Sequence, residues 1–219
     1  MSNPFFDSQI AGNYDRWYDS YVGKIYDKLE KQTISNIIKT KKRGYLLDVG
    51  CGTGHWSQYF SNAGFHVTGI DNSREMIEIA QRKKIKNCEF LKVNALNFEA
   101  DKKYNAASFI TSLEFMDNYK KIIKNIVKYL RDDGYIIIGV LNENSYLSRQ
   151  RKKKKNIYSK AHFFTFDGLK NLFSSYGSVK LKGCVYPSPN FIRYYKIIEY
   201  IGKLLNLKNS NFIAGKVNL

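Results

Sequence analysis

Residues 46–57 constrain the fold of this chain more than any other segment, because an apolar run there leads into three closely spaced glycines. The order of residues predicts a buried parallel strand ending near Asp48, a glycine turn over residues 50–54, and a helix that starts at His55. Glycines give the backbone unusual dihedral angles and let a ligand lie directly on the main chain. The first N–H groups of the helix are free to bind a polar or anionic group. The segment therefore predicts a ligand site where the first strand ends.

An acidic residue follows the second apolar run at a spacing that supports this site. Asp71 comes after residues 65–70 and lies about 20 residues beyond the glycine turn, the distance at which a carboxylate at the tip of the next strand meets ribose hydroxyls. The turn itself reads Asp-x-Gly-x-Gly-x-Gly, with Asp48 ahead of the first glycine. This order differs from the Gly-x-Gly-x-x-Gly fingerprint of dinucleotide-binding folds.

These two segments resemble the first and second motifs of the class I S-adenosylmethionine-dependent methyltransferases. In the same order, residues 90–96 resemble the strand and loop that hold adenine, residues 104–115 the fourth strand, and residues 130–138 the turn and fifth strand. The series spans residues 10–142 and is similar to the small-molecule branch, including the ubiquinone/menaquinone-biosynthesis type.

The resemblance implies S-adenosyl-L-methionine as methyl donor and S-adenosyl-L-homocysteine as product. It places the backbone of Gly50 and Gly52 against the methionine part, Asp48 on the amino group or on the turn itself, and Asp71 on both ribose hydroxyls. The remaining residues implied to border the cofactor are Tyr14, Cys51, His55, Asn72, Met76, Asn94, Ala95, Leu96 and Thr111.

Two of these positions carry a second interpretation. Asn94 is expected to meet the adenine edge, together with the backbone of residues 95–96, but relatives often have Asp there, and an ordinary loop residue is the alternative. His55 either caps its helix or lines the site.

No catalytic residue follows from the pattern, because transfer from a sulfonium mainly requires alignment and exclusion of water. Three residues are weak candidates. Glu114 ends the fourth predicted strand, with an exposed loop carboxylate as the alternative, and His162 lies in the region that relatives use to close the acceptor pocket. Tyr18 belongs to an aromatic stripe near the N-terminus.

That stripe predicts a first helix, broken at Gly23 and followed by a second helix over residues 24–39. Core packing is its ordinary interpretation. Because Tyr14 and Asp15 resemble the lid helix of the family, we expect a lid that turns further aromatic side chains toward the acceptor. Those side chains are Trp17, Tyr18 and Tyr21.

Alternating strand and helix patterns predict an α/β fold. Together with the resemblance, they indicate a Rossmann-like, doubly wound, seven-stranded, mostly parallel sheet with helices on both faces. Residues 178–185 and 211–217 supply an antiparallel edge pair. We expect one domain over residues 1–219, with a lid (1–40), a cofactor-binding core (41–142) and an acceptor-pocket segment with the C-terminal strands (143–219).

Composition favours a cytoplasmic protein without a membrane span. The three cysteines are scattered without metal-ligand spacing, no secretory signal is visible, and the longest apolar run falls far short of the roughly 20 residues that cross a bilayer. No metal is expected, and the sequence carries no signal for an oligomeric state.

The formal net charge of +17 raises the question of a nucleic-acid or anionic-membrane partner. Lys, Asn, Ile and Tyr are abundant throughout, however, so a compositional bias explains most of the charge. The dense cations of Arg151–Lys155 predict an exposed, mobile loop over residues 142–160 that could touch an acidic substrate or partner.

The leading hypothesis is transfer of a methyl group to a small-molecule acceptor. An RNA or DNA methyltransferase is supported by charge alone, because residues 112–115 read Ser-Leu-Glu-Phe instead of the Asp/Asn-Pro-Pro-aromatic turn that grips a flipped base. A non-enzymatic S-adenosylmethionine-binding regulatory protein is the third possibility.

Overall fold

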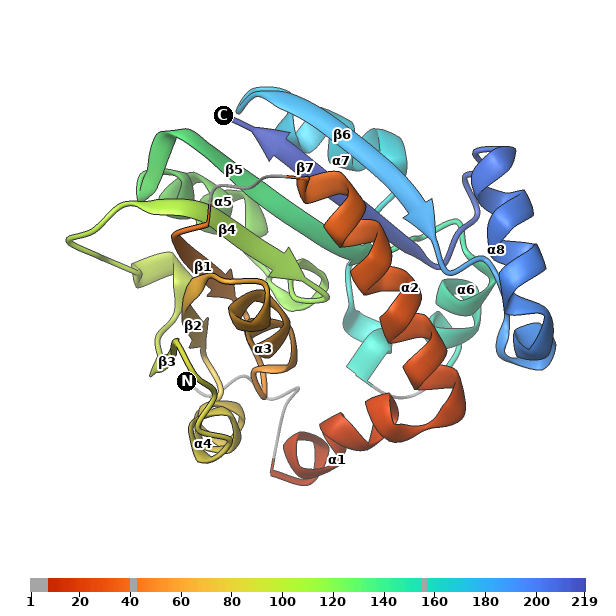
Figure 1. Ribbon diagram of the computed structural model, residues 1–219, viewed down its shortest axis with the longest axis horizontal. Helices are drawn as coiled ribbons and strands as arrows, with labels where there is room; N and C mark the ends of the chain where they lie inside the picture. The colour runs from red at the N-terminus through yellow and green to blue at the C-terminus, as the bar shows by residue number, and fades with distance from the viewer. Residues whose placement is uncertain (1–7, 40–42, 155–156) are drawn as a thin grey trace.

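The computed structural model describes residues 8–39, 43–154 and 157–219. They form a seven-stranded sheet with the strand order β3-β2-β1-β4-β5-β7-β6 (Figure 1). All neighbouring strands are parallel except β7, which runs antiparallel to both β5 and β6. The strands are β1 (Tyr45–Val49), β2 (His66–Asp71), β3 (Cys88–Lys92), β4 (Tyr104–Ile110), β5 (Leu130–Leu141), β6 (Ser178–Cys184) and β7 (Phe212–Asn218). The predicted fold class is confirmed.

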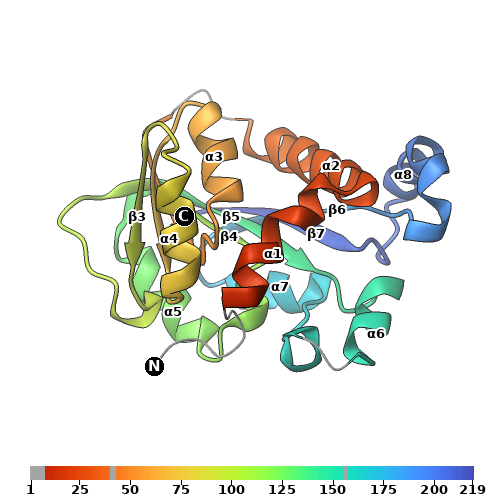
Figure 2. The same cartoon turned by 90° about the horizontal axis from the view of Figure 1, so that it is seen from below.

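Helices cover both faces of the sheet, which explains why β1, β4 and β5 are apolar on both sides. On one face α2 (Tyr21–Ile38) and α3 (His55–Asn62) bury residues such as Ile34 and Phe60. On the other face α5 (Tyr119–Val127) and α7 (Phe166–Phe173) bury residues such as Ile123 and Phe173. Figure 2 shows these two helical layers above and below the sheet. The helix α4 (Arg74–Arg82) packs against β3.

Strand order reverses at β1 and β4, because the chain leaves β1 toward β2 and returns on the other side. In open α/β sheets the carboxyl ends of such strands form a crevice that binds ligands. The helix α1 (Ser8–Asp19) lies across this edge, between α4 and α6 (Tyr146–Lys152) (Figure 2).

The junction between the first two helices differs from the prediction. The break falls at Ser20, whose hydroxyl accepts the Gly23 N–H and caps α2. Gly23 lies inside α2. A Cβ at this position would come within 1.9 Å of the Trp17 carbonyl oxygen. The glycine therefore permits close packing of α1 on α2 and does not end a helix.

The segment after β5 also differs, because it is not simply a loop. Ser145 caps α6 by accepting the Ser148 N–H, and both serines are buried. Cations at the end of α6 complement the negative helix terminus. Lys152, Lys153 and Lys154 are exposed, whereas Arg151 is half-buried, and Lys155 lies outside the described residues.

The C-terminal predictions hold with small shifts of boundary. Thr165 caps α7 by accepting the Gly168 N–H, and the expected antiparallel edge pair is present. β5 begins at Leu130 and includes Gly134, where the resemblance placed a turn. The short 3-10 helices are η1 (Ala95–Asn97), η2 (Leu113–Phe115), η3 (Ile157–Lys160) and η4 (Pro189–Tyr194), and the last helix is α8 (Tyr195–Leu204). None of the helices in the described ranges is long and apolar enough to cross a membrane.

Candidate active site

The glycine turn after β1 is tied to β2 by its backbone. The N–H groups of Gly50 and Cys51 both donate to the Ile70 carbonyl, at 2.8 and 3.0 Å. The φ angles of Gly50 and Gly52 are +73° and +53°, values that favour glycine. A Cβ on Gly50 would lie 2.6 Å from the Ser112 Cβ, whereas a Cβ on Gly52 would meet nothing closer than 3.9 Å. The backbone at Gly52 is thus open to a ligand.

Asp71 holds this turn from the tip of β2. Its Oδ2 accepts the Gly52 N–H at 2.9 Å, and its Oδ1 accepts the Ser73 N–H at 2.8 Å, where α4 begins. The Asn72 backbone N–H also contacts this carboxylate. A carboxylate has about four acceptor positions, so the group keeps acceptor capacity for a ribose hydroxyl. Burial raises the pKa of Asp71, and these backbone N–H groups oppose the shift.

Asp48 is enclosed beneath the turn. Both of its carboxylate oxygens accept serine hydroxyls, from Ser57 at 2.6 Å and Ser108 at 2.7 Å. These bonds tie the end of β1 to α3 and β4, and both expected roles of Asp48, on the donor amino group or on the turn, stay predictions. Cys51 and Met76 are also buried, at 8 % and 2 % exposure.

The residues expected near adenine lie at the ends of β2 and β3. Asn94 is exposed, and its Oδ1 accepts the Leu96 N–H at 3.0 Å, so this side chain caps η1 as an ordinary loop residue would. The Ala95 carbonyl already accepts the Asn125 side-chain amide at 3.2 Å. Asn72 is half-buried beside Asp71.

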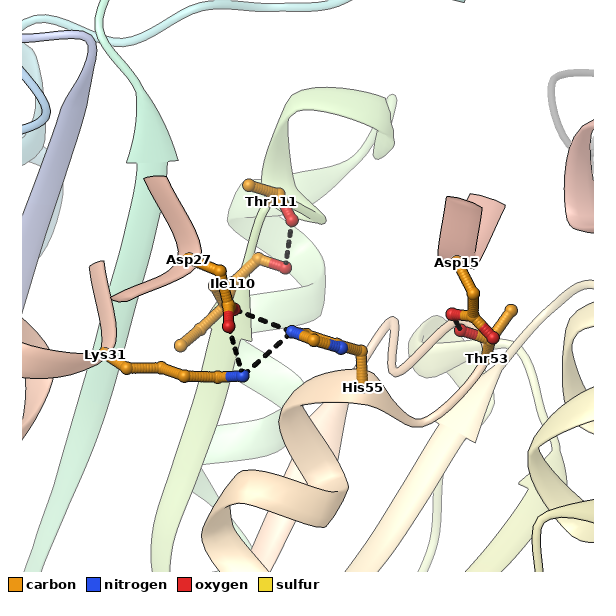
Figure 3. Close-up of polar contacts among 7 residues, drawn as sticks. All are labelled: Asp15, Asp27, Lys31, Thr53, His55, Ile110 and Thr111. Carbon is orange, nitrogen blue, oxygen red and sulfur yellow. Dashed lines mark hydrogen bonds and ion pairs between the residues drawn. The ribbon is translucent and has the colours of Figure 1, made fainter. Parts of the chain in front are cut away.

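His55 joins three helices and does not cap its own, because Gly54 is the N-cap of α3. Its Nε2 lies 2.7 Å from Asp27 Oδ1 and 3.0 Å from Lys31 Nζ, both on α2 (Figure 3). The Tyr18 ring of α1 stacks on the imidazole, with ring centroids 3.6 Å apart. Burial alone would raise the pKa of Asp27, but hydrogen bonds from His55 and Lys31 outweigh it and lower that pKa.

A second contact fixes α1 directly on the glycine turn. Asp15 Oδ1 accepts the Thr53 hydroxyl at 2.7 Å (Figure 3), and Asp15 Oδ2 pairs with Lys83 of α4 at 2.6 Å. Lys83 also donates to the Thr53 carbonyl at 2.8 Å. The sequence pattern pointed to Asp15 only through its place beside Tyr14, and it gave no signal for Lys83.

An aromatic cavity of about 410 Å³ lies under α1, beside the carboxyl ends of β4 and β5. Its aromatic wall is Tyr14, Trp17, Tyr18, Tyr26, Phe115 and Tyr158, and the other lining residues are Asn13, Asp27, Glu30, Thr111, Leu141, Arg151 and Ile157. Tyr21, which was expected to face the acceptor, is 66 % exposed and is not among these lining residues, because it begins α2 beyond the break at Ser20.

Glu30 and Asp27 are acidic residues of this cavity that the sequence motifs did not indicate. Burial raises the pKa of Glu30 to about 8, with a further rise from Asp27 and an opposing effect of Arg151. The sequence spacing indicates that this carboxylate is buried. Glu30 lies four residues after Tyr26 and four before Ile34, on the apolar face of the second helix.

Desolvation raises the pKa of Tyr14 to about 12 and that of Tyr18 well above its usual value. Both phenols therefore keep their protons near neutral pH. Tyr18 does not fit the role of a base, but its ring forms part of the cavity wall.

Glu114 and His162 do not line the aromatic cavity. Glu114 is 2 % exposed, so the interpretation as an exposed carboxylate is wrong. Its Oε1 accepts the Leu141 N–H at 2.6 Å, its Oε2 has no hydrogen-bond partner among the described residues, and burial raises its pKa to about 7. His162 stacks on Tyr119, 5.2 Å between centroids, and lines a separate hollow with residues of α7, so the structure places it away from the expected acceptor site.

Comparison of this chain with known proteins identifies its family. A family model described as a methyltransferase domain matches residues 14–181. An uncharacterized protein of Methanocaldococcus jannaschii is 31 % identical over 177 residues, which cover 80 % of this chain and 81 % of that protein. The malonyl-acyl-carrier-protein O-methyltransferase of Bacillus anthracis is 26 % identical over 155 residues, 64 % of this chain and 56 % of the enzyme. The chain thus spans about half the length of that curated relative.

Solved structures show the same fold. A methyltransferase of Thermotoga maritima, described as a possible histamine N-methyltransferase, has a TM-score of 0.75 at 21 % identity and covers 98 % of this chain and 97 % of its own. The N-methyltransferase NodS of Bradyrhizobium japonicum, solved with S-adenosylhomocysteine, has a TM-score of 0.71 at 14 % identity, with 99 % and 98 % covered. This chain belongs to the methyltransferase domain family, and the predicted resemblance to the S-adenosylmethionine-dependent methyltransferases is confirmed.

Proposed function

We propose that this protein transfers the methyl group of S-adenosylmethionine to a small-molecule acceptor held in the aromatic cavity. One observation carries the proposal: neighbouring residues of α1 touch both halves of the site. Asp15 contacts Thr53 of the glycine turn, while Tyr14 lines the aromatic cavity. A single helix thus closes over the expected donor site and the expected acceptor site, as the expected lid over residues 1–40 would.

The residues present fit the donor. The open backbone at Gly52 would take the methionine part, and Asp71 keeps acceptor capacity for the ribose hydroxyls. Aromatic faces favour a sulfonium cation, and Tyr14 and Tyr18 supply such faces at the cavity. The sulfonium brings an already activated methyl group, so the protein has to align the acceptor and exclude water.

Glu30 lines the aromatic cavity and is our candidate for the general base that accepts the proton of the acceptor. A heteroatom that attacks the methyl group must give up any proton it carries, and a carboxylate with a pKa of about 8 is matched to that task near neutral pH. Asp27 is less suited, because hydrogen bonds from His55 and Lys31 lower its pKa and so make it a weaker base.

The size and lining of the aromatic cavity favour a small acceptor over a nucleic acid. Its volume of about 410 Å³ lies in the usual range of about 300–1,000 Å³ for small-molecule pockets. Among the described residues that line it, Arg151 is the sole cation, which suits a phosphate backbone poorly. The relatives include a malonyl-acyl-carrier-protein O-methyltransferase and an N-methyltransferase, so both oxygen and nitrogen acceptors belong in a screen.

The test is acceptor-dependent formation of S-adenosylhomocysteine with panels of phenols, carboxylic acids and amines, and with RNA as the competing substrate. We expect turnover with one of the small-molecule classes and a large loss of turnover in Glu30→Gln. Turnover with RNA alone would overturn the small-acceptor proposal. Tight binding of the donor without turnover of any acceptor would support the non-enzymatic alternative.

A further inference from the structure

A cluster of large apolar side chains is exposed along η4 and α8. Phe191, Ile197, Tyr200, Leu204 and Leu205 each expose between 59 % and 67 % of their surface, and three further large hydrophobic residues of this segment are exposed to a lesser extent. Single exposed apolar residues are ordinary on soluble proteins, whereas a contiguous group marks an interaction surface.

The exposed residues lie on one face of α8. Ile197, Tyr200, Ile201 and Leu204 follow the spacing i, i+3, i+4, i+7, which places them on a single stripe. We call this stripe, with Phe191 and Leu205, the α8 face.

The opposite side of α8 is firmly docked. The Glu199 carboxylate accepts the Tyr186 N–H at 3.0 Å, and a Cβ on Gly202 would come within 2.3 Å of the Tyr186 ring. The α8 face therefore points outward from a helix that is held in place by its other side. Figures 1 and 2 both show α8 at the far end of the molecule from α3 and α4.

Charge around the α8 face has one sign. Arg193, Lys196, Lys203 and Lys208 are all exposed. The single acidic residue of the segment, Glu199, is buried and pairs with Lys203 at 2.8 Å. A second copy of this chain would bring another surface of the same sign to the contact, since the net charge is +17. An anionic surface that accepts apolar side chains complements both features.

We propose that η4 and α8 dock the protein on an anionic lipid bilayer, with the α8 face at the boundary between headgroups and acyl chains and with Arg193 and Lys196 on the headgroups. Lys203 pairs with Glu199, and Lys208 lies over the Phe166 ring. Amphipathic helices with apolar and aromatic residues on one side and flanking lysines bind such interfaces, and basic residues strengthen binding to anionic lipids. This docking is independent of the proposed methyl transfer, because the α8 face shares no residue with the aromatic cavity.

Flotation of the full chain with vesicles of phosphatidylcholine, with or without phosphatidylserine, tests the proposal. We expect binding to the anionic vesicles that weakens with salt, and little binding to the neutral ones. The double variant Tyr200→Asp/Leu204→Asp should reduce binding about tenfold or more. Both side chains are exposed, so the melting temperature should stay unchanged. The milder Tyr200→Ser/Leu204→Ser keeps the test valid if the first variant misfolds.

Two matched charge variants separate local docking from general attraction. Arg193→Ala/Lys196→Ala removes two cations next to the α8 face, and Lys120→Ala/Lys121→Ala removes two exposed cations at the start of α5. The first pair should weaken vesicle binding clearly more than the second. Equal losses, absence of vesicle binding, or a dimer in sedimentation that Tyr200→Asp/Leu204→Asp dissolves would overturn the proposal.

Discussion

The two halves of the carboxyl edge are built in different ways. At β1 and β2 the groups proposed to face the donor are mostly backbone, and they come from the glycine turn and from Asp71, about 20 residues apart. Over β4 and β5 the aromatic cavity is built from side chains of α1, α2, η2, α6 and η3, which lie far apart along the chain. The donor half is therefore set locally, whereas the acceptor half depends on how distant helices pack.

The largest effect is expected for Asp71→Ala in the donor half. If this carboxylate accepts two ribose hydroxyls, losing two bonds of about 1.5 kcal/mol or more should weaken S-adenosylhomocysteine binding about a hundredfold. Calorimetric titration measures the change, and Asp101→Ala, an exposed carboxylate, is the control. Unchanged affinity in a folded variant would place the ribose elsewhere.

A pair of glycine variants separates packing from ligand contact inside the same turn. Gly50→Ala puts a Cβ 2.6 Å from the Ser112 Cβ and should lower the free energy of unfolding by about 2 kcal/mol or more. Gly52→Ala meets no protein atom within 3.9 Å, so it should cost only the strain of a positive φ while weakening donor binding. Equal losses of stability in the two variants would contradict an open backbone at Gly52.

Replacing each of two tyrosines of α1 with alanine tests which half of the site each ring serves. Tyr14→Ala should weaken S-adenosylmethionine binding about tenfold, because the sulfonium cation loses an aromatic neighbour. Tyr18→Ala should mainly slow transfer. Tyr14→Phe keeps the ring and serves as the control. If both truncations lowered the melting temperature while the folded fraction kept its affinity, α1 would be a core helix and not a lid.

The smallest effect is a pH-dependent change of stability at Glu30. Its pKa is about 8 in the folded chain and near 4.5 in the unfolded chain, so ionisation favours unfolding increasingly as pH rises from 4.5 to 8. Glu30→Gln removes this effect and should raise the melting temperature by a few degrees at pH 8.5 and very little at pH 4.5. The exposed Glu89→Gln is the matched control. A gain that is the same at both pH values would rule out the raised pKa.

The same contrast explains what could be predicted from sequence. The alternation of strands and helices and the turn at residues 50–54 follow from local periodicity and glycine spacing, and both are present. Glu30 and Arg151 could not be assigned to one cavity, because α2 and α6 meet there only through tertiary packing. The position of His162 could not be predicted for the same reason. This residue stacks on the Tyr119 ring of α5 and lines a hollow separate from the aromatic cavity.

The most direct test is a crystal structure of this protein with S-adenosylhomocysteine. We expect the homocysteine part along Gly50 and Gly52, the ribose on Asp71, and the sulfur facing the aromatic cavity between Tyr14 and Thr111. A ligand bound away from the glycine turn, or a sulfur pointing away from the aromatic cavity, would contradict the proposed division of the site into a donor half and an acceptor half.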